Sequence, residues 1–173
     1  MSSGPSWSIK QLNSSNQEDF QAVLGPVFEK SPWIASKTWE RRPFVDRVQL
    51  LEEMTKTVEA AGESALLALI QAHPDLAARV DERRGLTSES LREQSGLFDL
   101  SEDPLDQLRV LNDAYRERFG FPFVICARLN SLFTIFDAMK SRITHDRQVE
   151  MAAAWAEIQK IAALRLADLV TDL

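Results

Sequence analysis

The chain has 173 residues, with 20 Lys and Arg against 26 Asp and Glu, two His and one Cys. This length fits one domain that needs no disulfide to bury its core. A single cysteine excludes an internal disulfide and any CxxC redox or zinc motif. Two histidines leave little for a His-rich metal site, and the net charge of −6 argues against nucleic-acid binding.

Targeting signals are also missing from the sequence. No apolar run approaches the roughly 20 residues of a membrane span, and the N-terminus lacks the basic-then-apolar pattern of a secretory signal. The last three residues, Thr171-Asp172-Leu173, are not a peroxisomal address of the Ser-Lys-Leu type. We therefore expect a soluble, cytoplasmic protein.

Helical periodicity dominates the first third of the chain. Apolar residues recur three and four positions apart over Phe20–Phe28, which predicts an amphipathic helix. Ser15 and Glu18 form the predicted capping box before it. A short helix is expected over Ser31–Arg42, with proline at its first helical position.

The next apolar stripe runs over Phe44–Val58 and is expected to end at Gly62, a residue typical of helix C-termini. Another helical face, over Leu66–Ile70, is expected to end at His73, because Pro74 disfavours the helical conformation of the residue before it. A charged loop and a short helix over Thr87–Ser95 should follow.

The second half of the chain is helical except for one segment. A long helix over Leu105–Phe119 is expected to open at Ser101 and close at Gly120. The apolar run Phe121–Ala127 has an early proline and no helical period. It is either extended or the buried start of the next helix, and periodicity cannot decide between them.

The remaining sequence predicts one helix over Leu132–Ile143 and a final long helix from Asp146 to the C-terminus, capped by Thr144. We find no strand alternation, βαβ rhythm or internal repeat. The prediction is an all-α fold: a single compact multi-helix domain of about seven to nine helices over residues 1–173.

Three positions do not fit a plain helical bundle. His73 shares the apolar face of Ile70, at a helix end that favours imidazolium while burial opposes it, which suits a proton-transfer residue. The alternative is a core histidine bonded to a backbone carbonyl. Ser90, Glu93 and Gln94 share a helical face that can bind a polar heterocycle, or Ser90 and Glu93 form only a capping box.

Arg165 is the third position, because it falls within an apolar arc of the last helix. A buried guanidinium needs an anion. That anion is either an internal carboxylate, such as Glu93 or Asp168, or a ligand carboxylate bound bidentately. Cys126 has no neighbouring cation to activate it and is expected to be an inert buried thiol. The chain contains no GxGxxG, P-loop or HExxH motif.

Longer stretches carry a family resemblance that extends from about Leu12 to Leu169. The matching segments are His73-Pro-Asp-Leu-Ala77, Leu86–Ser90 leading to Glu93-Gln94, Arg118–Arg128, Trp39–Phe44 and Glu157–Arg165. The sequence resembles the decarboxylases of 2-oxo-4-hydroxy-4-carboxy-5-ureidoimidazoline (OHCU). The resemblance implies an all-helical, homodimeric lyase without cofactor or metal, which forms (S)-allantoin in urate breakdown.

The resemblance also implies roles for particular residues. His73 is the expected catalytic acid/base, and Glu93 is expected to accompany it. Arg165 is expected to hold an anionic group of the ureidoimidazoline substrate. The remaining expected substrate-binding residues are Pro74, Ser90, Leu91, Arg92, Glu93, Gln94, Phe123, Val124, Ile125, Cys126 and Ala127.

Two other classes of function compete with the decarboxylase. One is a non-catalytic helical interaction module in which His73 and Arg165 are structural. The other is a hydrolase that depends on Cys126. Substitution of His73 separates the first alternative from the decarboxylase, and substitution of Cys126 separates the second.

Overall fold

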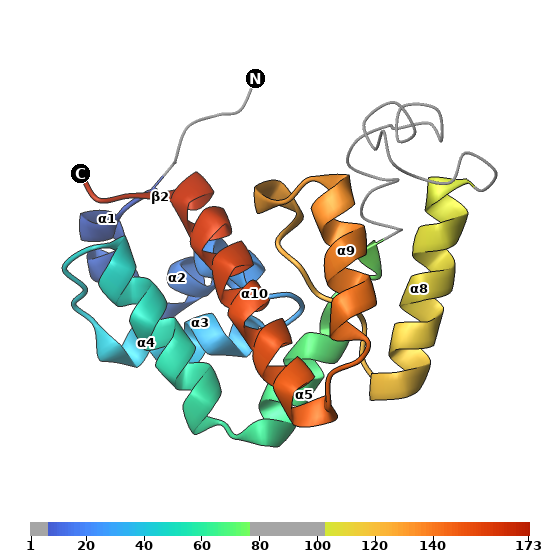
Figure 1. The fold of residues 1–173 in the computed structure, drawn as a ribbon. Helices are drawn as coiled ribbons and strands as arrows, with labels where there is room; N and C mark the ends of the chain where they lie inside the picture. The colour runs from blue at the N-terminus through green and yellow to red at the C-terminus, as the bar shows by residue number, and fades with distance from the viewer. Residues whose placement is uncertain (1–6, 77–102) are drawn as a thin grey trace. The chain divides into compact units, whose positions relative to one another are not determined.

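The computed structural model describes residues 7–76 and 103–173. These residues form eight α-helices, three short 3-10 helices and one pair of two-residue strands (Figure 1). The predominance of helix confirms the predicted all-α class. The chain divides into two compact units, the first made of Met1–Ala72 with Ile158–Leu173 and the second of His73–Glu157.

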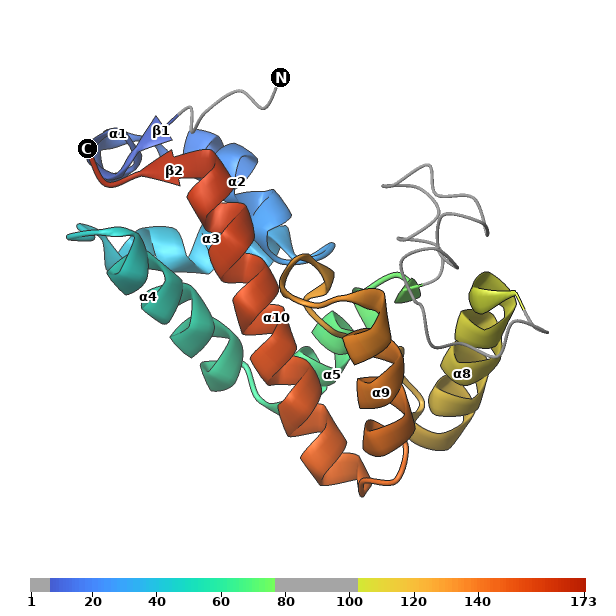
Figure 2. The same ribbon diagram turned by 45° about the horizontal axis from the view of Figure 1, so that its top comes forward.

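The first unit contains most of the short helices. Its elements in chain order are β1 (Trp7–Ser8), α1 (Ile9–Ser14), α2 (Gln17–Leu24), a 3-10 turn (Gly25–Val27), α3 (Pro32–Thr38), a second 3-10 turn (Trp39–Arg41), α4 (Arg47–Ala60), α5 (Glu63–Ala72), the end of α10 (Arg147–Leu169) and β2 (Val170–Thr171). The two strands pair in parallel, which joins the two ends of the described chain (Figure 2). The sequence did not predict this pairing, because two-residue strands carry no periodicity.

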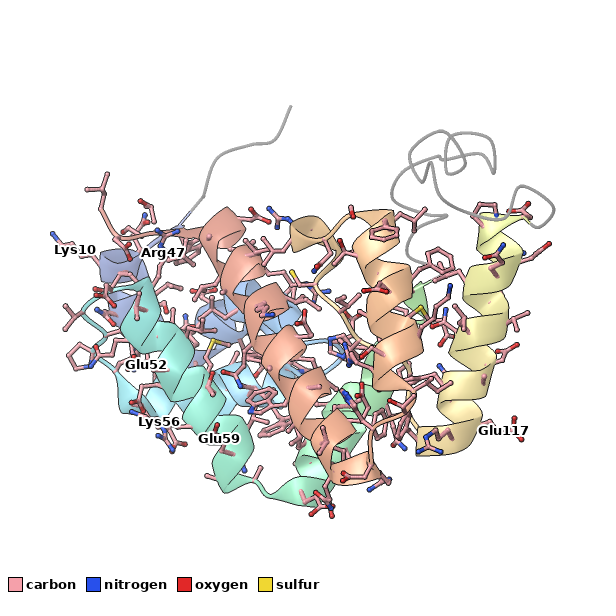
Figure 3. All side chains as sticks on the ribbon, viewed as in Figure 1. Lys10, Arg47, Glu52, Lys56, Glu59 and Glu117 are labelled. Carbon is pink, nitrogen blue, oxygen red and sulfur yellow. The ribbon has the colours of Figure 1, made fainter. Side chains whose placement is uncertain are left out.

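The core of the first unit comes from the predicted apolar stripes. α3 packs against both α2 and α4. Residues that these helices bury completely include Phe20, Ile34, Leu50, Met54 and Val58. The opposite face of α4 carries charged side chains, of which Glu52, Lys56 and Glu59 are labelled in Figure 3. One face of α4 is therefore core and the other is solvated, as its sequence pattern indicates.

The predicted capping box at Ser15 and Glu18 is wrong. Ser15 ends the preceding helix α1, and its hydroxyl donates to the Leu12 carbonyl at 2.8 Å. Asn16 caps α2 instead, accepting from the Asp19 backbone N–H at 2.8 Å. The hydroxyl of Ser15 therefore bonds to a carbonyl in the last turn of α1, a helix that the periodicity did not reveal.

The starts of α4 and α10 also differ from the prediction. Asp46, rather than Phe44, opens α4, and its carboxylate accepts from the Gln49 N–H at 2.8 Å. The predicted cap Thr144 is also wrong: its hydroxyl donates back to the Ser141 carbonyl. Asp146 caps α10 by accepting from the Val149 N–H at 2.9 Å. A short polar side chain can serve the helix before it or the one after it, and sequence spacing does not distinguish them.

The second unit contains α8 (Pro104–Phe119), a 3-10 turn (Ala127–Leu129), α9 (Leu132–Arg142) and the beginning of α10. α8 and α9 lie against each other (Figure 1). The predicted stops at Gly62 and Gly120 are confirmed, with φ of +87° and +77°. α10 ends at Leu169, before the C-terminus, because β2 follows it. The helix expected over Thr87–Ser95 and the start at Ser101 lie outside the described residues.

Candidate active site

A small pocket in the second unit brings together five of the predicted site residues. It is lined by His73, Pro74, Leu76, Phe123, Val124 and Ile125. Leu76 is the one lining residue that the sequence analysis did not name. Segments about 50 residues apart in the sequence therefore line one pocket.

The first lining segment begins where α5 ends. α5 stops at Ala72, as Pro74 predicted, and His73 is only 3% exposed. Asp75 lies between the lining residues Pro74 and Leu76, and its carboxylate accepts from Arg116 of α8 at 2.6 Å. The turn that carries the histidine is therefore attached to a long helix of the same unit.

The second lining segment, Phe123–Ile125, is the wall of the pocket. It belongs to the apolar run for which the sequence left two conformations open, and the structure shows it non-helical. The run is almost completely buried, from Phe121 to Cys126. Buried backbone outside a helix or sheet needs other hydrogen-bond partners.

Side chains supply those partners. The Cys126 N–H donates to Glu157 Oε2 at 2.8 Å, and the Cys126 carbonyl accepts from Asn130 Nδ2 at 2.9 Å. Arg142 Nη1 donates to the Val124 carbonyl at 2.8 Å. The Cys126 side chain itself is buried. In this site the backbone of Cys126, more than its thiol, makes the polar contacts.

A buried ionic cluster lies behind the wall, and the sequence analysis missed it. Glu150 is completely buried and accepts from the Tyr115 hydroxyl and from Arg142 Nε. Burial and the hydrogen bond to Glu150 raise the pKa of Tyr115 far above its ordinary value. Glu150 precedes Met151 and Ala154 on the buried face of α10, so the helical-wheel test that singled out Arg165 would have found it.

His145 also contacts this cluster. Its side chain is 35% exposed, and its Nδ1 lies 3.1 Å from Glu150 Oε2. The second histidine of the chain therefore belongs to a different site from His73.

Arg165 belongs to the first unit, where an internal acid contacts it. Its Nη2 lies 2.8 Å from Glu29 Oε2, and its Nη1 donates to the Pro26 carbonyl at 3.2 Å. The internal partner shown by the structure is thus Glu29, which the sequence analysis did not consider. The expected contact of Arg165 with substrate stays a prediction.

The other predicted residues are placed as follows. Ala127 directly follows the wall and opens the 3-10 turn. Ser90, Leu91, Arg92, Glu93 and Gln94 lie outside the described residues. Across the described ranges, no three His, Cys, Asp or Glu side chains gather closely enough to hold a metal ion. No helix in these ranges is both long and apolar enough to cross a membrane.

Comparison with known proteins identifies the family. A family model described as OHCU decarboxylase matches residues 13–167, which includes parts of both compact units. The chain belongs to the OHCU decarboxylase family. The sequence resemblance is confirmed by this match.

Individual relatives agree with this assignment. The OHCU decarboxylase of Halalkalicoccus jeotgali is 40% identical over 163 residues, which are 93% of this chain and 90% of the relative. The OHCU decarboxylase of Mus musculus is 39% identical over 162 residues, which are 92% of this chain and 91% of the relative. The crystal structure of an (S)-allantoin synthase superposes with a TM-score of 0.72 at 26% identity. That match covers 94% of this chain, which spans about half (54%) of the crystallised one.

Proposed function

We propose that this protein is a carboxy-lyase that converts OHCU to (S)-allantoin in urate degradation, without a cofactor. The observation that carries the proposal is the pocket in which buried His73 faces the non-helical wall Phe123–Ile125. It is supported by the names of the two relatives, which are about 40% identical over nearly their whole length.

The chemistry needs few groups. Loss of CO₂ leaves an electron pair on a ring carbon, and the adjacent C=N of the imidazoline can accept it, so an external electron sink is unnecessary. The protein has to orient the carboxylate, move one proton and shield one face of the ring. One titratable side chain in a pocket with a buried wall meets the last two requirements.

His73 is the proton-transfer group in this proposal. An imidazole can take the proton of the 4-hydroxyl, which becomes a carbonyl of the product, or deliver a proton to the adjacent ureido-bearing carbon, which becomes the stereocentre. With only 3% of His73 exposed, bulk water has little access to its ring. Val124 and Ile125 line the pocket, so a ring held against them would be protonated on its other face, which would yield a single enantiomer.

The roles of Glu93 and Arg165 rest on the family resemblance. Glu93 is proposed to orient the imidazole or accept ureido N–H groups, with Ser90 to Gln94 lining the substrate. Arg165 is proposed to bind an anionic group of the substrate, for which its planar guanidinium is suited. Glu29 would have to share that guanidinium.

We also propose that the protein is a cytoplasmic homodimer and that the whole chain acts as one decarboxylase domain. The family match across residues 13–167 supports the last point, since it includes parts of both compact units. Light scattering coupled to gel filtration would measure the mass of the assembly against 19.6 kDa for one chain. Cell fractionation would test the location.

A coupled assay tests the activity. Urate, uricase and hydroxyisourate hydrolase generate OHCU in the cuvette, and circular dichroism follows (S)-allantoin with and without this protein. We expect clear acceleration over spontaneous decay. A His73→Ala variant should lose about 100- to 10,000-fold in kcat, the usual contribution of a general acid or base. An unchanged rate for this variant, with a native far-UV spectrum, would refute the proposed role of His73.

A further inference from the structure

The carboxylate of Glu150 is the centre of a buried cluster in the second unit. Glu150 is 0% exposed and comes from the first turn of α10. Its Oε1 accepts from the Tyr115 hydroxyl and from Arg142 Nε, the latter at 2.7 Å, and its Oε2 lies 3.1 Å from His145 Nδ1. We call these four residues the Glu150 cluster. A buried carboxylate is tolerated only with such partners.

Arg142 connects this cluster to the wall of the His73 pocket. While its Nε binds Glu150, its Nη1 donates to the Val124 carbonyl at 2.8 Å. Its guanidinium carbon lies 4.3 Å from the centre of the Phe123 ring. Arg142 is itself only 9% exposed, so these contacts are made largely out of water.

Tyr115 adds a second contact with the wall. Its ring meets the Phe123 ring edge to face, with the centres 5.3 Å apart and the planes at 89°. The hydroxyl of Tyr115 points to Glu150. The Glu150 cluster therefore contacts the wall at two points, the Val124 carbonyl and the Phe123 ring.

The wall depends on these contacts because of its conformation. Residues 121–126 form no helix or strand, so no regular ladder fixes their backbone. Partners from α9 and α10 take that role, with Arg142 at Val124 and Glu157 at Cys126. The position of the wall relative to His73 is thus determined by charged side chains that do not line the pocket.

We infer that Arg142, held in place by Glu150, is a positioning residue for the decarboxylation. This inference rests on the proposed function. Its physical basis is that reacting groups must be placed within a fraction of an ångström, and a misplacement of about 1 Å can cost about 100-fold in rate. Loss of the Arg142 fork should move the wall and slow the chemical step more than it weakens substrate binding.

The substitution Arg142→Lys tests this. Lysine keeps the charge, but one ammonium cannot reproduce the fork that reaches Glu150 and Val124 together, and it lacks the planar face for Phe123. We expect kcat to fall about tenfold or more, with KM changed by less than about threefold. Thermal melting of the same samples shows whether the variant is folded at the assay temperature.

Arg147→Lys is the matched control. Arg147 lies in the same unit, donates to the Phe119 carbonyl at 3.3 Å and lies 5.7 Å from the Phe121 ring centre. In the described part of the chain its side-chain hydrogen bonds go to the Phe119 carbonyl and to Met151 Sδ, and not to Val124 or Glu150. We expect its kcat and KM to stay within about threefold of the wild type, because the wall is unaffected.

Two further variants keep the test decisive if Arg142→Lys does not fold. Tyr115→Phe keeps the ring on Phe123 and removes one hydrogen bond to Glu150, and we expect kcat to fall about two- to tenfold at unchanged KM. In Arg142→Ala, guanidinium chloride should restore part of kcat at concentrations where sodium chloride of equal ionic strength does not. Such rescue reports the missing group itself.

The outcomes separate this inference from the proposed function. Absence of acceleration by the wild-type protein would refute the proposed function and, with it, this inference. An active wild type together with an Arg142→Lys variant that melts lower but keeps the wild-type kcat would overturn the inference alone. So would a folded Tyr115→Phe with wild-type kcat, or rescue of Arg142→Ala by sodium chloride as well as by guanidinium.

Discussion

Replacement of Glu29 by glutamine tests whether Arg165 binds the substrate. Glu29 Oε2 lies 2.8 Å from Arg165 Nη2, so its carboxylate competes with any substrate anion for the same guanidinium. The Pro26 and Val27 carbonyls accept from Arg165 Nη1 and would keep the side chain oriented after the change. We therefore expect Glu29→Gln to lower stability and to strengthen substrate binding.

The size of both effects follows from the exposure of the pair. The side chains of Arg165 and Glu29 are 19% and 23% exposed, so solvent screens their attraction. Two unit charges about 4 Å apart attract by about 4 kcal/mol at an effective dielectric constant of about 20, but desolvation and ordering reduce the net value of such pairs to about 1 kcal/mol. For Glu29→Gln, a change of this size corresponds to a melting temperature lower by about 2–4 °C and to a kcat/KM higher by about fivefold.

The coupled circular-dichroism assay measures kcat/KM, and differential scanning fluorimetry measures the melting temperature. Glu53→Gln is the matched control, since Glu53 is 18% exposed and pairs with Arg41 at 2.8 Å in the same unit. We expect this control to melt lower by a similar amount with unchanged kcat/KM, because Arg41 has no predicted role in the site.

One result would refute the reasoning about Arg165. If Glu29→Gln melts lower while kcat/KM stays at the wild-type value, then Arg165 is a structural residue whose partner is internal. Arg165→Lys provides a second reading. It should raise KM and lower kcat if the bidentate fork holds substrate, and leave both unchanged if the fork holds only Glu29.

Three more substitutions test local features. Cys126→Ser should keep activity within about tenfold, because the backbone of Cys126 makes the contact with Glu157, whereas a loss of several orders of magnitude would revive a cysteine mechanism. Hydrogen bonds from the Arg47 backbone N–H and side chain lower the pKa of Asp172, so Asp172→Asn should melt lower at neutral pH. A carboxyl group whose pKa is lowered by folding stabilises the folded state only at pH values above that lowered pKa. The difference in melting temperature between Asp172→Asn and the wild type should therefore disappear as the pH falls from 3.8 through the lowered pKa, and a difference that stays constant would contradict the assignment. Gly120→Ala should lower the free energy of unfolding by about 1–2 kcal/mol, because alanine is strained at the φ of +77° that Gly120 adopts. The added methyl would meet no neighbouring atom, so the backbone strain is the whole effect, and a melting temperature equal to that of the wild type would contradict it.

Much of the fold could be predicted from the sequence, because amphipathic helices leave a local record. The stripe at Phe20 to Phe28 marked a buried face, and Gly62 and Gly120 marked real helix ends. The errors fell at helix starts such as Ser15 and Thr144, where a hydroxyl can bond to the helix on either side. The helix α1 and the two strands were missed for a different reason, because they are too short to show a full period of apolar residues.

The candidate site could be predicted only in part. His73 and Phe123 to Ile125 stood out as a proline-bounded histidine and as a run without helical period. Arg142 and Glu157 did not, because spacing along the chain does not show which backbone groups a helical charge contacts, and Glu150 was missed although it lies on the apolar face of α10. The partner of Arg165 was predicted to be an acid, but spacing along the chain could not point to Glu29, 136 residues away.

The sequence by itself determined the helical class, the family and the scarcity of groups able to transfer a proton, since these depend on periodicity, motif and composition. Only the tertiary structure decided that the run after Gly120 is non-helical and that it meets His73 in one pocket. It also decided which charges hold that run in place. The physical reason is that a buried backbone outside regular structure takes its hydrogen-bond partners from whatever the fold brings near, and sequence distance does not limit that choice.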